Sequence, residues 1–484
     1  MVFSSISFLL YFLPIFLFLY YLSAKKHKNW VILAASIFFY SWGAPKFVFI
    51  LLASTFVDFY LVRWMHQTDE KKKKKLLLGF SIAINLGLLA FFKYANFFVE
   101  NVNSFLSNFG GDAIQWTKIA LPIGISFYTF QTLTYSIDVY RKVHKPLKKV
   151  WDYILYIMMF PQLIAGPIVR FNTIADQIED RNETDNDRLL GFYRFCIGLA
   201  KKVLIANVLG AAVASVIGES PEAVLQVDWG MVNSAIAWWC ILAYTFQIYF
   251  DFSGYSDMAI GLGRMLGFKF PENFDNPYTS RSITEFWRRW HITLGAFMRE
   301  YLYFPLGGSK IKSRSRIYFN LWFVFLMSGL WHGASWNFVL WGAFHGVFLI
   351  LERVFLLDLF KKMGKSGSII GLLYCFFVVM MGWVLFFIED LSSVGTFYSK
   401  LFAFDFSHVS SPYTNEFFFI LSVAIFFAFC TLLKPIQKIH DLIYFGEYKS
   451  WQIILMFVIT LSLFAFSVAS IAASSFNPFI YYRF

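Results

Sequence analysis

Residues 249–268 read YFDFSGYSDMAIGLGRMLGF, and this stretch decides what kind of fold the chain can adopt. It overlaps an apolar run, 229–260, that is long enough to cross a lipid bilayer, yet it carries the carboxylates Asp251 and Asp257. A charged side chain at membrane depth is costly and normally faces a protein interior or a water-filled cavity. We therefore expect other helices to surround this segment, with at least one of the two carboxylates paired with an arginine or a histidine.

The composition of the whole chain indicates an integral membrane protein. Of its 484 residues, 58% are hydrophobic and 21% aromatic, and the mean hydropathy of +0.57 lies far above that of a soluble domain. The prediction is an all-α polytopic membrane protein with roughly 11–13 helices around a central polar funnel, some of them broken or re-entrant. The apolar runs centre on 3–22, 30–43, 46–64, 76–97, 119–138, 151–168, 189–217, 229–260, 317–352, 368–388, 415–433 and 451–473.

Positive charge is concentrated in short loops between these runs, and the formal net charge is +12. Lysine and arginine in such loops follow the positive-inside rule and orient a membrane protein, so we expect no nucleic-acid partner. The rule predicts that both ends of the chain lie outside the cytoplasm, including the tail 474–484. The run 317–352 conflicts with this topology unless it crosses twice or re-enters, because basic loops flank it on both sides. The basic loops are 25–29, 66–75, 141–149, 310–316 and 361–365.

No repeat of fixed period and no low-complexity linker divides the sequence. We therefore predict one membrane domain over residues 1–484. Its polar residues concentrate between 249 and 346, where Asp, Ser, Asn, Arg and Trp interrupt an apolar frame. Such irregular polar segments persist at membrane depth only where protein surrounds them or where they line a watery cavity.

Within this polar region, a helix is expected to begin near residue 282. Ser282 and Glu285 have the spacing of a capping box. On that helix Trp287, Arg288 and His291 are expected to lie within about one turn, on neighbouring faces. Arginine beside tryptophan also suits a simple interfacial anchor.

Three of the eight histidines lie in the polar region, and five lie in loops or near the ends of apolar runs. His332 is flanked by Ser328 and Asn337 within an apolar surround, which favours a neutral imidazole. A neutral imidazole in a dry pocket is the base needed to remove a proton from an alcohol. A structural, hydrogen-bonded histidine is the alternative for His332. His291 is the second candidate, and His345 is interpreted as a satisfied packing histidine.

Other catalytic signatures fail on inspection. The stretch GYSDM (254–258) has Met258 where a nucleophile elbow needs glycine, and LFKKMGKS has Leu359 where a phosphate-binding loop needs its first glycine. The sequence contains no H-E-x-x-H, and its four cysteines are scattered through apolar runs. We therefore predict no metal and no resident cofactor.

Seven stretches of this sequence are typical of one family: FFKYANFF (91–98), LPIGISFYTFQTLTYSIDVYR (121–141), QLIAGPIVR (162–170), YFDFSGYSDMAIGLGRMLGF (249–268), NFDNPYTSRSITEFWRRWHITL (273–294), YLYFPLGG (301–308) and SGLWHGASWNFVLWG (328–342). In these stretches the sequence resembles the membrane-bound O-acyltransferase (MBOAT) family, in the branch of the alginate O-acetyltransferase membrane subunits and the peptidoglycan O-acetyltransferases. The resemblance extends over most of the chain from about residue 30 onward.

The resemblance implies transfer of an acetyl group from a cytoplasmic thioester donor, expected to be acetyl-CoA, to a hydroxyl of an alginate-like exopolysaccharide or of peptidoglycan. His332 matches the family's catalytic histidine, and His291 matches its second signature histidine. The implied location is the bacterial cytoplasmic (inner) membrane, in contact with lipid, and the implied partner is a hydrolase-like extracytoplasmic acetyltransferase. The side chains expected to line or support the funnel are Asp251, Asp257, Asn276, Arg288, Ser328 and Asn337.

The chain ends in NPFIYYRF (477–484). Phe479, Tyr481 and Phe484 fit the spacing Phe-x-Tyr-x-x-Phe, which resembles the C-terminal signature of this branch and of the small companion peptide of teichoic-acid D-alanylation. The resemblance implies that the Tyr481 hydroxyl accepts the acetyl group near His332 and passes it on. An aromatic anchor at the membrane surface is the alternative.

Three other functions remain open at this stage. A secondary transporter would also use broken polar helices, but it predicts two matching halves, which the sequence does not show. Transfer of D-alanine to teichoic acid fits the same motifs, because they mark the scaffold and leave the donor open. An acyltransferase directed at protein or lipid fits them less closely.

Overall fold

The computed structural model shows an all-α protein over the residues that it describes, which are 1–407, 411–446, 448–474 and 476–480. The all-α prediction is therefore confirmed. Within these ranges, six helical stretches are long and apolar enough to cross a membrane. The six are Phe47–Gln67, Lys71–Asn108, Asp185–Ile217, Gly364–Phe387, Asn415–Leu432 and Ser450–Ala473.

The chain forms two compact units. The first holds Met1–Phe192 and Ala259–Pro271. The single domain 1–484 stays a prediction. The helices of the first unit are α1 (Leu13–Leu22), α2 (Lys28–Gly43), α3 (Phe47–Gln67), α4 (Lys71–Leu89), α5 (Ala95–Asn108), α6 (Ile125–Tyr140), α7 (Val150–Met158), α8 (Phe160–Leu163) and α9 (Phe171–Glu179).

The second unit holds Tyr193–Met258 and the described part of Glu272–Phe484. Two helices run from one unit into the other, α10 (Asp185–Ala200) and α13 (Ser234–Met265). The remaining helices are α11 (Asn207–Ile217), α12 (Pro221–Val224), α14 (Ile283–Arg289), α15 (Ile292–Phe297), α16 (Arg314–His332), α17 (Trp336–Leu351), α18 (Leu357–Lys362), α19 (Gly364–Phe387), α20 (Leu391–Phe402), α21 (Asn415–Phe429), α22 (Lys434–Phe445) and α23 (Ser450–Ala473).

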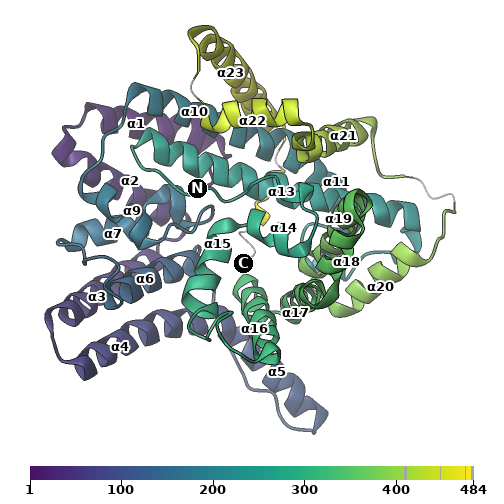
Figure 1. The fold of residues 1–484 in the computed structure, drawn as a ribbon, viewed down its shortest axis with the longest axis horizontal. Coiled ribbons are helices and arrows are strands. Elements are labelled where there is room, and N and C mark those ends of the chain that lie inside the picture. The colour runs from purple at the N-terminus through teal and green to yellow at the C-terminus, as the bar shows by residue number, and fades with distance from the viewer. Residues whose placement is uncertain (408–410, 447, 475, 481–484) are drawn as a thin grey trace. The chain divides into compact units, whose positions relative to one another are not determined.

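In the first unit, a buried carboxylate lies among helices that pack side by side. Helices α3, α4 and α6 are neighbours (Figure 1), and α3 carries Asp58, which is only 1% exposed. Its carboxylate accepts hydrogen bonds from Ser81 Oγ (2.5 Å), Asn85 Nδ2 (3.0 Å) and Tyr153 Oη (2.5 Å). A buried carboxylate needs such donors, so this network fixes how the helices meet.

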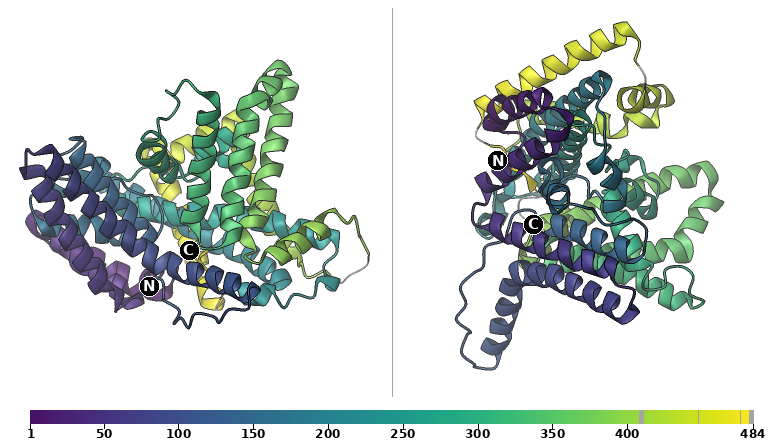
Figure 2. Two further views of the ribbon diagram at one scale, coloured as in Figure 1. Left: turned by 90° about the horizontal axis from the view of Figure 1, so that it is seen from below. Right: turned by 90° about the vertical axis from the view of Figure 1, so that its left-hand side faces the viewer.

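The apolar run 317–352 contains two helices, α16 and α17, that pack against each other and are separated by a break at Gly333–Ser335. Helix α17 also packs against α19, and Figure 2 shows these green helices standing side by side. A Cβ atom added at Gly329 would clash with the Phe338 carbonyl, so glycine permits this close approach. The basic loops on both sides of this run required that it cross the membrane twice or re-enter, and a helical hairpin meets this requirement.

Helix α14 begins where the sequence predicted. Ser282 is its N-cap, and its hydroxyl accepts from the backbone N–H of Glu285 at 3.0 Å. The prediction that His291 lies on this helix is wrong, because the helix ends at Arg289 and His291 has a left-handed backbone with φ 45°. Beyond Arg289 the backbone pairs with a neighbouring segment instead, as the 3.0 Å bond from Ile292 N to the Asn273 carbonyl shows.

Candidate active site

His332 is the last residue of α16, and its side chain is enclosed by aromatic rings. The residue is only 3% exposed. The centroid of its imidazole lies 4.9 Å from the Trp331 ring, 5.1 Å from the Trp341 ring and 5.2 Å from the Phe386 ring. Such rings exclude water and restrict the orientation of the imidazole.

His291 lies beside His332, with 6.5 Å between the two ring centroids. Its Nδ1 is 3.1 Å from Asn273 Oδ1. A carboxamide oxygen only accepts, so Nδ1 carries the proton and Nε2 carries the lone pair. Burial lowers the pKa of His291 to about 3, so the ring is neutral at neutral pH. The structure thus brings the two candidate catalytic histidines together, and their catalytic roles stay predictions.

Asn273 is a site residue that the sequence reasoning missed. Its Oδ1 also accepts from Thr293 Oγ1 at 2.8 Å, and its Nδ2 donates to Ser256 Oγ at 3.0 Å. Asn276, the asparagine predicted to support the funnel, is partly exposed and has the left-handed backbone conformation that starts a short 3-10 helix. Both asparagines stand in the same polar stretch, so the sequence held no local signal that separates them.

We expect Asn273→Ala to lower activity by about tenfold to a hundredfold, since a lost buried hydrogen bond costs about 1–3 kcal/mol. Asn273→Asp keeps an acceptor for His291 Nδ1 and is expected to retain more activity, whereas Asn276→Ala is expected to have a smaller effect. Acyl transfer by the three purified variants measures this. Equal loss in the Ala and Asp variants would contradict a role for Asn273 in orienting His291.

The other expected supports of the funnel differ in their surroundings. Ser328 is buried one turn before His332 on α16. Asn337 is buried in the first turn of α17 and donates from Nδ2 to the Leu385 carbonyl at 3.0 Å. Arg288 is exposed in the last turn of α14.

His345, on α17, packs as the sequence suggested but is not satisfied by hydrogen bonds. It is fully buried, with its ring centroid 4.9 Å from the Trp287 ring and 5.2 Å from the Trp341 ring. Neither ring nitrogen has a hydrogen-bond partner in the part of the chain that the structure describes.

Asp257 is held in a cluster of opposite charges. Its Oδ1 lies 2.7 Å from an Arg194 nitrogen and its Oδ2 lies 2.6 Å from Lys201 Nζ. Arg194 also pairs with Glu272 at 2.5 Å. The predicted pairing of an intramembrane carboxylate with an arginine is thus present at Asp257. The two partners of Asp257 could have been found in the sequence, because Arg194 and Lys201 are cations within the apolar run 189–217 and need a counterion there.

Asp251 pairs with Lys202 and, through that pair, holds the C-terminal segment. The Lys202 Nζ to Asp251 Oδ1 distance is 2.7 Å, and both side chains are 2% exposed. Asp251 Oδ2 accepts from the backbone N–H of Ile480 at 2.9 Å, and Lys202 donates to the carbonyl of Pro478. Phe479 stacks on Tyr255 with 4.5 Å between ring centroids. The segment before residue 481 is therefore inserted among the helices of the second unit. Tyr481 and Phe484 lie outside the described residues.

We expect Asp251→Ala to release this segment and to destabilise the protein, because a buried lysine without its counterion costs about 3–5 kcal/mol. The double variant Asp251→Leu/Lys202→Met removes both charges and is expected to recover the melting temperature but not the segment's anchorage. Carboxypeptidase digestion followed by mass spectrometry measures the anchorage. Full protection of the C-terminus in the double variant would contradict this role.

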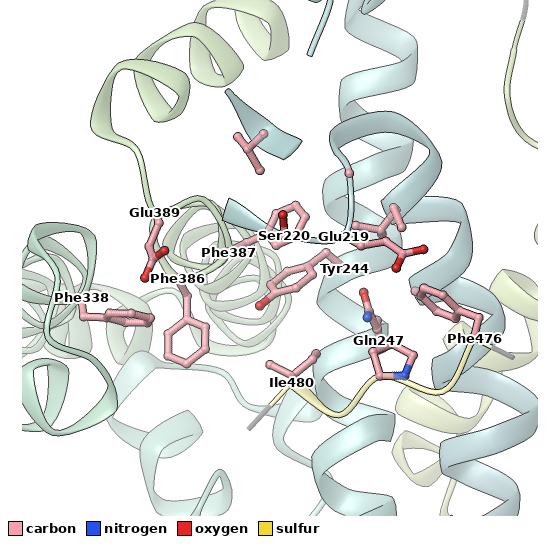
Figure 3. A pocket seen from close by; sticks show the side chains of 16 residues that line it. Glu219, Ser220, Tyr244, Gln247, Phe338, Phe386, Phe387, Glu389, Phe476 and Ile480 are labelled. Atoms are coloured by element: carbon pink, nitrogen blue, oxygen red, sulfur yellow. The ribbon is translucent and has the colours of Figure 1, made fainter. Parts of the chain in front are cut away.

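A cavity of about 390 Å³ lies within the second unit (Figure 3). Its lining combines aromatic rings, two carboxylates and residues of the C-terminal segment, and Figure 3 shows Phe338 and Phe386 together at one side. The lining includes Glu219, Tyr244, Phe338, Phe386, Phe387 and Glu389.

Comparisons of the sequence with known proteins identify the family of the chain. A sequence model of the "membrane-bound O-acyltransferase family" matches residues 4–389. The chain is 37% identical to a "Probable alginate O-acetylase AlgI" of Pseudomonas putida over 100% of both chains. It is 41% identical to the protein of that name in Pseudomonas aeruginosa, over 84% of this chain and 75% of the relative. It is 35% identical to the peptidoglycan O-acetyltransferase of Helicobacter pylori, over 81% of this chain and 78% of the relative. The chain belongs to the membrane-bound O-acyltransferase family and is a multi-pass membrane O-acetyltransferase.

Proposed function

We propose that this protein moves an acetyl group from acetyl-CoA, a cytoplasmic thioester, across the inner membrane for O-acetylation of an extracytoplasmic polysaccharide. The observation that carries the chemistry is His332, a buried imidazole held by three aromatic rings beside a second imidazole. The named activities of the relatives, on alginate and on peptidoglycan, support this class of acceptor.

In the proposed reaction His332 acts as the base. It takes the proton from a hydroxyl group while the hydroxyl oxygen attacks the thioester carbonyl carbon. A C–O bond forms, the C–S bond breaks, and the proton passes to the departing thiolate. Because the thiolate is a good leaving group, the protein has to supply mainly positioning and proton removal. His291, with its lone pair on Nε2, is the neighbouring group that shapes this site.

The first acceptor in this proposal is the hydroxyl of Tyr481. It follows directly on Ile480, whose backbone is bound to Asp251 in the interior of the second unit. A phenyl ester suits a relay because a phenol, with a pKa of about 10, leaves more easily than a sugar alcohol. A hydrolase-like extracytoplasmic acetyltransferase is the proposed partner that takes the acetyl group to the polymer.

Purified protein in proteoliposomes tests the donor. With radiolabelled acetyl-CoA we expect label on the chain, released as free acetate by mild base as from an ester. A D-alanyl thioester of a carrier protein is the matched alternative donor and is expected to give no label. Labelling by the D-alanyl donor alone would overturn the acetyl assignment in favour of the D-alanyl one.

A further inference from the structure

The cavity in the second unit shares one wall with the candidate active site. Phe386 lines the cavity, and its ring also lies 5.2 Å from the ring of His332, nearly perpendicular to it at 76°. Phe338 lines the cavity next to Phe386, with 5.2 Å between the two ring centroids. The Phe386 ring therefore borders both this cavity and the imidazole.

The other side of the cavity meets water. Glu219 lines that side, whereas Glu389 lines the cavity near Phe386 (Figure 3), and both residues are exposed. Exposed carboxylates are not stable in hydrocarbon, so this surface is aqueous and not lipid-covered. Figure 3 shows Glu219 at the side of the cavity opposite Phe338 and Phe386. Phe338 and Phe386 thus face the exposed Glu219 across the cavity (Figure 3).

We propose that Phe386 is the barrier that keeps this water from the thioester at His332. The proposal rests on the proposed function, in which His332 is the base. A base that removes a proton from an alcohol removes one equally well from water. The side reaction is hydrolysis: the water oxygen forms a C–O bond to the acyl carbon, the C–S bond breaks, and its proton passes through His332 to the thiolate. Acetate and free thiol are the products, and the acceptor receives nothing.

The packing around Phe386 holds the ring in this place. It is 3% exposed, and it lies 5.2 Å from the Trp341 ring and 5.5 Å from the Trp383 ring. The preceding residue, Leu385, is fixed by the hydrogen bond from Asn337 to its carbonyl. Because the ring is packed on all these sides, it is expected to stay in place and to keep the cavity closed towards His332. The hydroxyl that is to be acylated then has to reach His332 by a route other than free diffusion through the cavity.

The test compares two neighbouring phenylalanines. Phe386→Ala removes the ring that borders both the cavity and His332. Phe387→Ala is the control: Phe387 lines the same cavity, but its ring stacks on Tyr244, with 4.2 Å between the ring centroids. The probe is acetyl-CoA added to proteoliposomes without partner or polymer, and the readout is free CoA thiol. We expect Phe386→Ala to raise CoA release by about tenfold or more, Phe386→Leu to raise it less, and Phe387→Ala to leave it at the wild-type rate.

Adding His332→Ala to Phe386→Ala separates this proposal from the proposed function. If His332 is the base, the double variant releases no CoA above background. Normal polymer acetylation by His332→Ala alone would overturn the proposed function. If His332→Ala is inactive while folded Phe386→Ala and Phe386→Leu both release CoA at the wild-type rate, only the barrier is overturned. If Phe386 only supports the fold, Phe386→Ala and Phe386→Leu are both expected to release less CoA than the wild type. That result would also contradict the barrier.

Discussion

Replacing His332 with alanine is expected to abolish polymer acetylation while the protein remains folded in the membrane. In the proposed reaction the imidazole accepts the proton of the attacking hydroxyl, and its loss is expected to lower the rate by about 10²- to 10⁴-fold. The side chain lies at the end of α16 among three rings that also pack against other residues. Its removal therefore leaves the helical hairpin in place. Polymer-bound acetyl ester in cells that express the variant measures the effect.

The matched control is His144→Ala, which removes a partly exposed imidazole that binds Asp176 in the first unit. This control is expected to acetylate normally. The amount of His332→Ala protein in membranes and its melting temperature in detergent show whether folding is intact. Normal acetylation by well-folded His332→Ala protein would remove His332 from the reaction.

The second large effect is expected at Tyr481. Tyr481→Phe keeps an aromatic ring and deletes only the hydroxyl, so it is expected to stop acetylation of the polymer if that hydroxyl carries the acetyl group. The bonds that hold the preceding segment, from Ile480 N to Asp251 and from Lys202 to Pro478, do not involve the phenol. Loss of activity would then report on the relay and not on the anchorage. Polymer acetylation in cells and label on the C-terminal peptide from radiolabelled acetyl-CoA are the measurements.

The control for this prediction is the adjacent residue. Tyr482→Phe makes the same chemical change one position later, and it is expected to reduce acetylation much less. If Tyr481→Phe acetylates the polymer normally, the relay is wrong and the tail serves only as an anchor. If both variants are inactive, the carboxypeptidase assay shows whether the segment has come loose.

The sequence by itself determined the class of the protein, the start of one helix in the polar region 249–346 and the presence of ion pairs within the apolar runs. Long apolar runs divided by basic loops identify a helical membrane protein, because hydropathy and loop charge are properties of the local chain. The start of α14 at Ser282 was predictable for the same reason, since a cap involves residues only three apart. The charged residues within apolar runs pointed correctly to ion pairs, as Asp257 and Arg194 show.

Only the tertiary structure decided which of these residues meet. The backbone turn that takes His291 off α14 depends on pairing with residues 273–275, and this pairing also made Asn273 and not Asn276 the partner of the imidazole. Asp251 holds the backbone of Ile480, which lies 229 positions away in the chain. Phe386 carries no polar side-chain atom that a sequence motif would single out, yet it lines a cavity and its ring lies 5.2 Å from the ring of His332. Contacts of this kind form between distant segments, so they depend on how the helices pack, and no local pattern of residues encodes them.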